Sequence, residues 1–183
     1  LSMTMNYDDG QVVRAPGTVI ITAVGECPDV QKCLTPDLKP APDSRLLYAD
    51  LSGDAGCPLG GSALAQSLAT VGRDVPTVKD AVLFKDTFNA LQELVRSGVV
   101  LAGHDVSGGG LITAVSEMAF AGNIGCTLAL RENSAELPAR LFTEKPAVVL
   151  QVLAENVTPV AAALAAAGAT VEEIGRIGGD AVT

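Results

Sequence analysis

Apolar residues along the chain form two patterns: short runs rich in β-branched residues, and longer stretches in which apolar positions recur every three or four residues. The short runs are typical of buried strands, and the longer stretches of helices with one apolar face. The runs predict strands over residues 18–24, 45–51, 99–105, 126–130, 147–153 and 171–177. The stretches predict helices over residues 62–71, 78–97, 111–121 and 158–167, with helical turns over 28–34 and 132–140. This alternation predicts a layered α/β or α+β domain.

The first 17 residues show neither pattern. They are largely polar, and they open with neither an initiator methionine nor a strand or helix. We therefore expect residues 1–17 to be a linker or extension cut from a longer polypeptide, and residues 18–183 to form the domain.

The length of 183 residues suits one domain, or one domain with an extension. A hydrophobic content of 48% is ample for a core, and with only 3% aromatic residues that core must consist of Val, Leu, Ile and Ala. No apolar run approaches the roughly 18 residues of a membrane span, and no signal-peptide pattern opens the chain. We expect a soluble protein without a membrane partner.

The formal charge of −9 argues against a nucleic-acid partner, because binding to a phosphate backbone needs a basic surface. Nucleotides remain compatible with this charge, since Mg²⁺ can bridge carboxylates and phosphates. The four cysteines form no CxxC pair and have no histidine nearby, so zinc is disfavoured. A disulfide stays open, but reduced thiols in the cytoplasm are the favoured interpretation.

The segment HDVSGGGL at residues 104–111 is the main candidate site, because there a predicted strand gives way to a predicted helix. Backbone N–H groups at a helix N-terminus favour anions, and glycine lets phosphate approach the backbone. Asp105 is a hard oxygen ligand suited to Mg²⁺, and in α/β folds ligands bind beyond the carboxyl ends of strands. We expect a phosphate–metal site with Asp105 as metal ligand and with Ser107, Gly109 and Gly110 as phosphate contacts.

The neighbouring polar residues allow more than one interpretation. A Ser-His-Asp hydrolase is disfavoured, because alternation along a strand sends His104 and Asp105 to opposite faces. A satisfied structural histidine and an Asp that caps the turn remain open. For Glu117 we favour a solvated or helix-facing carboxylate. Glu144 is either a turn residue, which is slightly favoured, or a hydrogen-bond acceptor near a ligand.

A second glycine-rich connector, over residues 52–61, also leads into a predicted helix. It lacks the lysine of a P-loop, so that interpretation fails. We favour glycine serving a tight connection over an anion contact at Gly60, Gly61 or Ser62.

The HDVSGGGL segment, followed by SEMAFAG at residues 116–122, resembles phosphoribosylformylglycinamidine synthase, the amidotransferase of purine biosynthesis. LGGSALAQ at residues 59–66 and LFTE at residues 141–144 support the resemblance, which spans nearly the whole chain. In that family the synthetase core has two tandem halves, each similar to aminoimidazole ribonucleotide synthetase. The resemblance implies that this chain is the C-terminal domain of the second half, with a mixed β-sheet packed against helices.

The resemblance also implies a reaction, ligands and partners. The whole enzyme would convert formylglycinamide ribonucleotide, ATP and glutamine to the amidine, with the preceding synthetase domain and the following glutaminase domain as partners in the same polypeptide. Asp105 would coordinate Mg²⁺ on bound ATP or ADP, and Ser107 would contact that nucleotide. The site could serve turnover or, as the large single-chain form favours, an auxiliary structural role. We expect no catalytic residue in this chain and no activity of the fragment alone.

One position departs from the family pattern. Gly108 stands where the family usually has Asp after the serine, which removes a negative charge from the turn. Two alternatives to the leading interpretation stay open. One is another enzyme of the same superfamily, such as selenophosphate synthetase or thiamine-phosphate kinase, and the other is a non-enzymatic ligand-binding or assembly domain.

Overall fold

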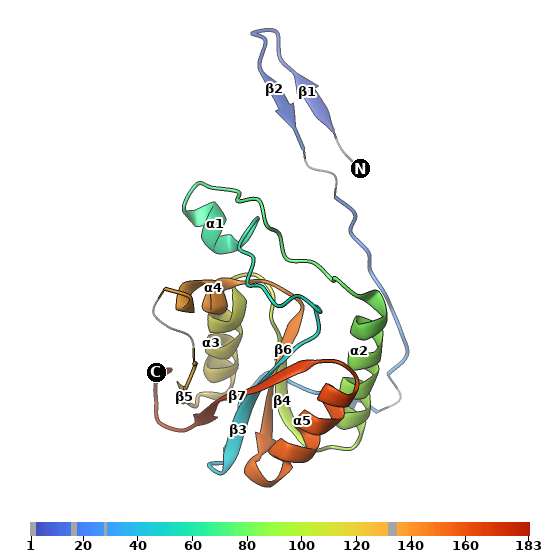
Figure 1. Cartoon of the computed structure of the whole chain (residues 1–183), viewed down its shortest axis with the longest axis vertical. Coiled ribbons are helices and arrows are strands. Elements are labelled where there is room, and N and C mark those ends of the chain that lie inside the picture. Colours follow the sequence, from blue (N-terminus) through green and yellow to red (C-terminus); the bar gives the residue numbers. More distant parts are fainter. Residues whose placement is uncertain (1–2, 16–17, 28, 132–134) are drawn as a thin grey trace. The chain divides into compact units, whose positions relative to one another are not determined.

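The computed structural model describes residues 3–15, 18–27, 29–131 and 135–183. The chain divides into two compact units, Leu1–Val30 and Gln31–Thr183. The larger unit is built on a five-stranded sheet with the order β4-β6-β3-β7-β5 (Figure 1). Its strands are β3 (Ser44–Asp50), β4 (Val100–Asp105), β5 (Cys126–Leu128), β6 (Ala147–Leu153) and β7 (Thr170–Ile177).

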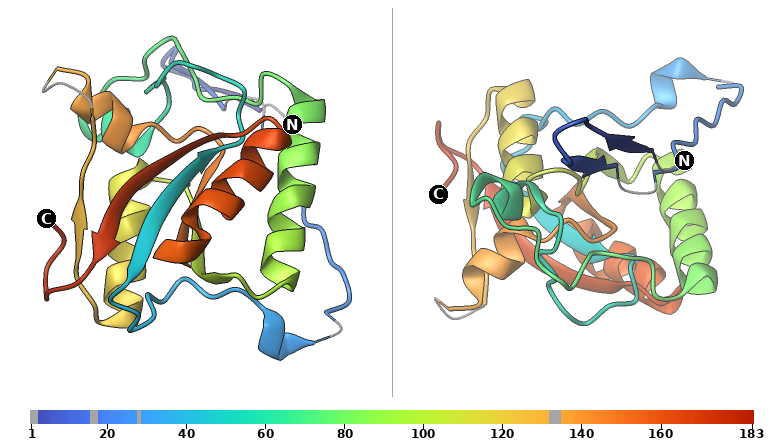
Figure 2. Two further views of the ribbon diagram at one scale, coloured as in Figure 1. Left: turned by 60° about the horizontal axis from the view of Figure 1, so that its bottom comes forward. Right: turned by 90° about the horizontal axis from the view of Figure 1, so that it is seen from above.

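Helices cover both faces of this sheet, as the two views of Figure 2 also show. The α-helices are α1 (Ala63–Ser67), α2 (Ala81–Arg96), α3 (Gly110–Gly122), α4 (Leu137–Phe142) and α5 (Val157–Ala166). The 3-10 helices are η1 (Val30–Lys32) and η2 (Ala154–Asn156). One apolar cluster lies between the sheet and α3, and the other lies between the sheet and the pair α2 and α5. The domain therefore has three layers.

The central strand β3 shows why the chain forms this sandwich. Leu46 and Tyr48 lie in the cluster with α3, whereas Leu47 and Ala49 lie in the cluster with α2 and α5. All four residues are buried, because successive side chains of a strand point to opposite faces and both faces are covered.

Local signals fix the ends of the helices. The Asp80 carboxylate accepts hydrogen bonds from the N–H groups of Val82 (2.9 Å) and Leu83 (3.0 Å), which caps the start of α2. Asn123, in the left-handed conformation, ends α3. α1 ends after Ser67, well before the residue 71 that periodicity predicts. There Ala69 is left-handed (φ 53°) and the Thr70 N–H bonds back to the Ala65 carbonyl.

The predicted layered fold is confirmed, and the strand directions sharpen it. Each pairing between named strands of the described sheet is antiparallel. The rule that places ligands at the carboxyl ends of strands applies to parallel α/β sheets, so it does not support the Asp105 site here. The relevant feature is that β4, which ends at Asp105, is an edge strand of the sheet.

The strand predicted over residues 18–24 is wrong. These residues form no strand, and Val19, Ile20, Ile21 and Val24 are 81–93% exposed. A β-branched run forms a strand only when it hydrogen-bonds to a neighbouring strand, and no described segment pairs with residues 18–24. The prediction of an irregular opening was also wrong, since β1 (Thr4–Asn6) and β2 (Val12–Arg14) form an antiparallel hairpin.

The remaining differences concern element ends. The strand predicted over residues 126–130 stops at Leu128, and the helical turn predicted over 28–34 is reduced to η1. The turn predicted over 132–140 corresponds in part to α4, and residues 132–134 lie outside the described residues. Across the described ranges, none of the helices combines the length and apolarity needed to cross a membrane.

Candidate functional site

Asp105 and Ser107 lie together where β4 ends. The Ser107 hydroxyl donates a hydrogen bond to the Asp105 carboxylate, whose side chain is 72% exposed. The Val106 N–H donates to the Ala147 carbonyl (2.8 Å), which holds the strand end against β6. The structure thus presents a carboxylate and a hydroxyl to solvent from a fixed piece of backbone.

His104 is held within the domain by its neighbours. Its Nδ1 lies 2.7 Å from the Asp105 carbonyl oxygen, and its Nε2 lies 3.1 Å from the Glu117 carboxylate. Glu117 therefore contacts the histidine of β4 from α3, and its side chain is 54% exposed. His104 Nδ1 also lies 3.5 Å from Asp105 Oδ1, so the expectation that the two side chains point to opposite faces was wrong. Among the described residues no hydrogen bond joins His104 to Ser107, so these residues do not form a Ser-His-Asp triad.

The two glycines expected to contact phosphate already donate their N–H groups to the protein itself. Gly109 N–H donates to Glu144 Oε1 (2.8 Å), and Gly110 N–H donates to the Ser107 carbonyl (3.0 Å). Both glycines have positive φ, 87° and 74°. A Cβ at Gly110 would lie 2.5 Å from the Leu141 carbonyl oxygen, so glycine here lets α4 pack against the turn.

Gly108 differs from its neighbours. It has no left-handed conformation, and a Cβ built on it meets no atom within 4 Å. The Cβ of an aspartate at this position would therefore meet no steric obstacle.

The second glycine-rich connector is fastened by three consecutive residues, which we call the clamp: Thr143, Glu144 and Lys145. The Thr143 hydroxyl donates to the Pro58 carbonyl (2.8 Å). Glu144 Oε1 accepts from the Ala63 N–H (2.7 Å), and Lys145 Nζ donates to the carbonyls of Asp54 (2.8 Å) and Gly56 (2.9 Å). The clamp thus holds the connector along its length.

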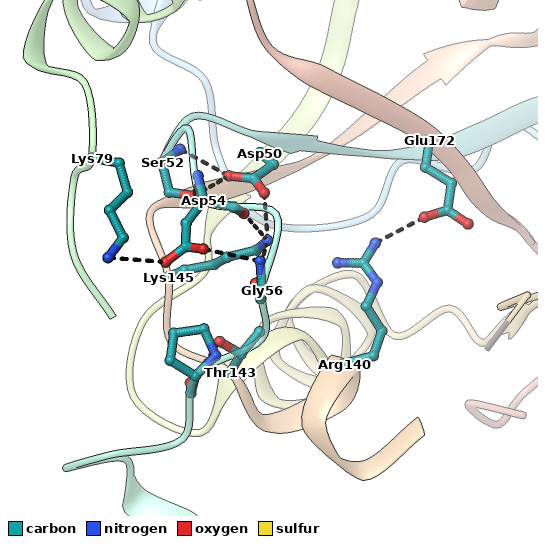
Figure 3. Close-up of polar contacts among 10 residues, drawn as sticks. Asp50, Ser52, Asp54, Gly56, Lys79, Arg140, Thr143, Lys145 and Glu172 are labelled. Carbon is teal, nitrogen blue, oxygen red and sulfur yellow. Dashed lines mark hydrogen bonds and ion pairs between the residues drawn. The ribbon is translucent and has the colours of Figure 1, made fainter. Parts of the chain in front are cut away.

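Lys145 also forms a buried ion pair. Its Nζ lies 2.5 Å from Asp50 Oδ2, and the side chains are 5% and 9% exposed (Figure 3). The other oxygen of Asp50 accepts from the backbone N–H (2.8 Å) and hydroxyl (2.6 Å) of Ser52. Because every polar group of the pair has a partner, these contacts offset the cost of removing both charges from water.

Gly60 in this connector has a packing role, since a Cβ there would lie 2.6 Å from the Asp74 carbonyl oxygen. The Ser62 hydroxyl accepts from the Ala65 N–H (3.2 Å) as the N-cap of α1. Both observations agree with the favoured structural interpretation of residues 60–62.

A cavity of about 490 Å³, lined by both charged and apolar residues, lies beside the connector, between β3, β7 and α4. Arg140, 7% exposed, stacks 3.8 Å above the Tyr48 ring and donates to Glu172 (3.0 Å). Among the described residues the buried Tyr48 hydroxyl has no hydrogen-bond partner, and burial raises the pKa of Tyr48 above its ordinary value, against the lowering effect of Arg140.

A shallower, largely apolar groove of about 310 Å³ lies next to Asp105. Leu34, Leu91, Val148 and Leu150 line it, with His104 and Asp105 as its polar residues. It offers apolar surface directly beside the exposed carboxylate.

Sequence reasoning named Asp105 and Ser107 as candidate site residues, and it did not name Asp50, Arg140 or Lys145 as such. Glu144 was named, with the turn interpretation slightly favoured, whereas the structure makes it an acceptor for both glycine-rich turns. For Glu144 and Lys145 the available signal was the LFTEKP segment, which runs from the end of α4 to the start of β6. Within the described ranges, no group of three or more His, Cys, Asp or Glu side chains could hold a metal ion.

The fold and the turn define a class of protein. The family model described as AIR synthase related protein, C-terminal domain, matches residues 50–183, and the chain belongs to this family. Solved structures agree on the fold: PurL from T. maritima in complex with ATP superimposes with a TM-score of 0.60 at 17% identity, covering 91% of this chain and 24% of that one. The hydrogenase maturation protein HypE in complex with ATP gives 0.55 at 16% identity, covering 84% and 47%.

Curated relatives narrow the class. The chain is 43% identical over 172 residues to the probable phosphoribosylformylglycinamidine synthase, chloroplastic/mitochondrial, of Arabidopsis thaliana, covering 93% of this chain and 12% of that protein. It is 37% identical over 169 residues to the phosphoribosylformylglycinamidine synthase of Homo sapiens, covering 92% and 13%. The chain thus spans about an eighth of the length of these relatives.

Proposed function

We propose that this chain is a domain of a phosphoribosylformylglycinamidine synthase and that it contributes Asp105 and Ser107 to a Mg²⁺–nucleotide site. The observation that carries the proposal is the exposed Asp105–Ser107 pair at the end of β4. Relatives of that name, 35–43% identical over more than nine-tenths of the chain, support the choice of enzyme.

The residues present fit part of a Mg²⁺ site. Mg²⁺ takes oxygen ligands in an octahedron and is commonly held by one or two carboxylates, with water and phosphate oxygens completing the set. Asp105 would hold the cation, and the Ser107 hydroxyl would orient the carboxylate or contact the nucleotide. Further protein ligands would come from the preceding synthetase domain.

The reaction proposed for the whole enzyme joins nitrogen to carbon at the expense of ATP. Formylglycinamide ribonucleotide is activated at its amide oxygen by phosphoryl transfer from ATP, and ammonia released from glutamine displaces the phosphate to give the amidine. When bound, Mg²⁺ supplies charge neutralisation at the phosphates. The site of this chain would serve that turnover or an auxiliary nucleotide that stabilises the architecture.

The proposed partners are the other domains of the same polypeptide. All described residues of Leu1–Val30 are exposed, including Ile20 and Ile21 at more than four-fifths. Since such apolar surface is normally covered, we propose that the preceding synthetase domain covers it and that the glutaminase domain follows. A cytoplasmic location remains a proposal from the cysteine pattern, and the name of one relative places that protein in chloroplasts or mitochondria.

Calorimetric titration of the longer polypeptide with MgADP tests the proposal. Asp105→Ala should weaken MgADP binding by at least about tenfold, because a carboxylate ligand of the cation is lost. Asp86→Ala, at an exposed position of α2, is the matched control and should leave binding unchanged. Undiminished MgADP binding in Asp105→Ala would remove Asp105 from the site.

A further inference from the structure

One carboxylate oxygen connects the two glycine-rich turns of the domain. Glu144 is 81 residues from Ala63 and 35 from Gly109 in sequence, yet its Oε1 accepts the N–H groups of both (2.7 and 2.8 Å). Hydrogen bonds from N–H groups to a carboxylate are about twice as strong as neutral ones. Glu144 thus fixes the distance between the connector over residues 52–61 and the turn that follows Asp105.

The position of this oxygen has a consequence for phosphate binding. Gly109 is the N-cap residue of α3, where partial positive charge attracts an anion. The Glu144 carboxylate supplies that anion from within the domain. Gly110 N–H is also engaged, with the Ser107 carbonyl (3.0 Å).

The surroundings of Gly109 and Gly110 also indicate that contacts within the domain determine the conformation of the turn. A Cβ at Gly109 would lie 2.2 Å from Thr113 Oγ1, and one at Gly110 would meet the backbone of α4. Close packing accounts for both glycines without a ligand. The flanking clamp residues Thr143 and Lys145 are 1% and 4% exposed, so Glu144 projects from a fixed backbone.

We propose that Glu144 is a positioning residue and the internal anion of the triglycine turn, so that nucleotide phosphates engage this domain through the cation at Asp105 and not through the amides of Gly109 and Gly110. The part played by the cation and the nucleotide rests on the function proposed above. The contacts of Glu144 with the two turns stand without it.

Hydrogen exchange of the full-length polypeptide, followed on peptides that contain residues 63 and 109, tests the proposal. Glu144→Ala leaves both amides without their acceptor, and their exchange should become about tenfold to a hundredfold faster. Glu144→Gln keeps an acceptor but loses the charge, so it should exchange at an intermediate rate. Added formate should slow exchange in Glu144→Ala, because a small carboxylate refills the vacated position, and should leave the wild type unchanged.

Glu155→Gln, at an exposed residue of η2, is the matched control and should exchange as the wild type does. Wild-type exchange in both Glu144 variants, or formate without effect on Glu144→Ala, would overturn the proposal. MgADP titration separates the two proposals. Loss of MgADP binding in Asp105→Ala, together with faster exchange at residues 63 and 109 in Glu144→Ala, supports both proposals. Unchanged MgADP binding in Asp105→Ala overturns the proposed function, and the exchange of the Glu144 variants then decides the role of Glu144 alone.

Discussion

Adjacent glycines in the HDVSGGG turn meet different physical demands. Gly110 has φ 74°, and its Cβ position is blocked by the backbone of Leu141 and Phe142, whereas Gly108 is open and has an ordinary φ. Gly110→Ala should therefore lower the free energy of unfolding by about 2 kcal/mol or more. Gly108→Asp should change it by less than about 1 kcal/mol, and the acidic side chain near the start of α3 favours stabilisation.

Urea denaturation of the two variants beside the wild type measures this contrast. If Gly108→Asp were as unstable as Gly110→Ala, the open space around Gly108 would not explain its tolerance of a side chain, and the contrast would be contradicted.

Loss of Lys145 should destabilise the domain strongly. Lys145→Met leaves Asp50 as a buried carboxylate without its cation and frees two carbonyls of the connector. The expected loss is about 3–5 kcal/mol. Lys85→Met, at an exposed position of α2, should stay within about 0.5 kcal/mol of the wild type. Thermal unfolding checks both, and equal midpoints for the two variants would contradict the assigned role of the Asp50–Lys145 pair.

For single residues, the sequence allows a contact to be predicted when its two partners lie close together in the chain. Asp105 and Ser107 bond across two positions, and their types and place before a helix point to them directly. Glu144 and Lys145 contact residues 35–95 positions away in the chain. No periodicity or spacing contains such contacts, because they depend on how α4 and β6 are placed in the fold.

Among the elements, β3 and α4 meet at an unusual contact, where Arg140 stacks on Tyr48. Within the part of the chain that the structure describes, the Tyr48 hydroxyl has no hydrogen-bond partner, so Tyr48→Phe should change the free energy of unfolding near pH 7 by less than about 1 kcal/mol. Its effect should appear at alkaline pH. Burial raises the pKa of Tyr48, so above about pH 10 the phenol ionises in the unfolded chain before it does in the folded one.

That difference makes the wild type lose stability as the pH rises through about 10, and Tyr48→Phe should lose less. Urea denaturation near pH 7 and near pH 10.5 measures the slope. Tyr7→Phe, in the exposed hairpin, is the control. Equal alkaline losses in the wild type and Tyr48→Phe would contradict the burial of an unsatisfied phenol.

Element prediction from the sequence succeeded where a pattern is locally complete. The helix α2 was predicted over residues 78–97 from its apolar recurrence, and its observed start at Ala81 follows from the Asp80 cap. The run over residues 18–24 has the composition of a strand, but a strand also requires a neighbour that its own residues do not specify. The hairpin β1–β2 was missed because its strands are three residues long, too short to show alternation.

For the whole molecule, the two units differ in how they can be stable. Gln31–Thr183 contains both apolar clusters, whereas no described residue of Leu1–Val30 is buried. Deletion of residues 1–30 should therefore leave the thermal midpoint of the remaining chain within about 2 °C. A fall much larger than this would show that the first unit contributes to the core.

The central claim is that Asp105 holds a nucleotide-bound cation jointly with another domain. A structure of the longer polypeptide with MgADP tests it most directly. The account predicts Mg²⁺ about 2.0–2.1 Å from an Asp105 carboxylate oxygen, with Glu144 still bonded to the N–H groups of Ala63 and Gly109. A Mg²⁺ ion ligated wholly by other residues, with Asp105 turned to solvent, would contradict it.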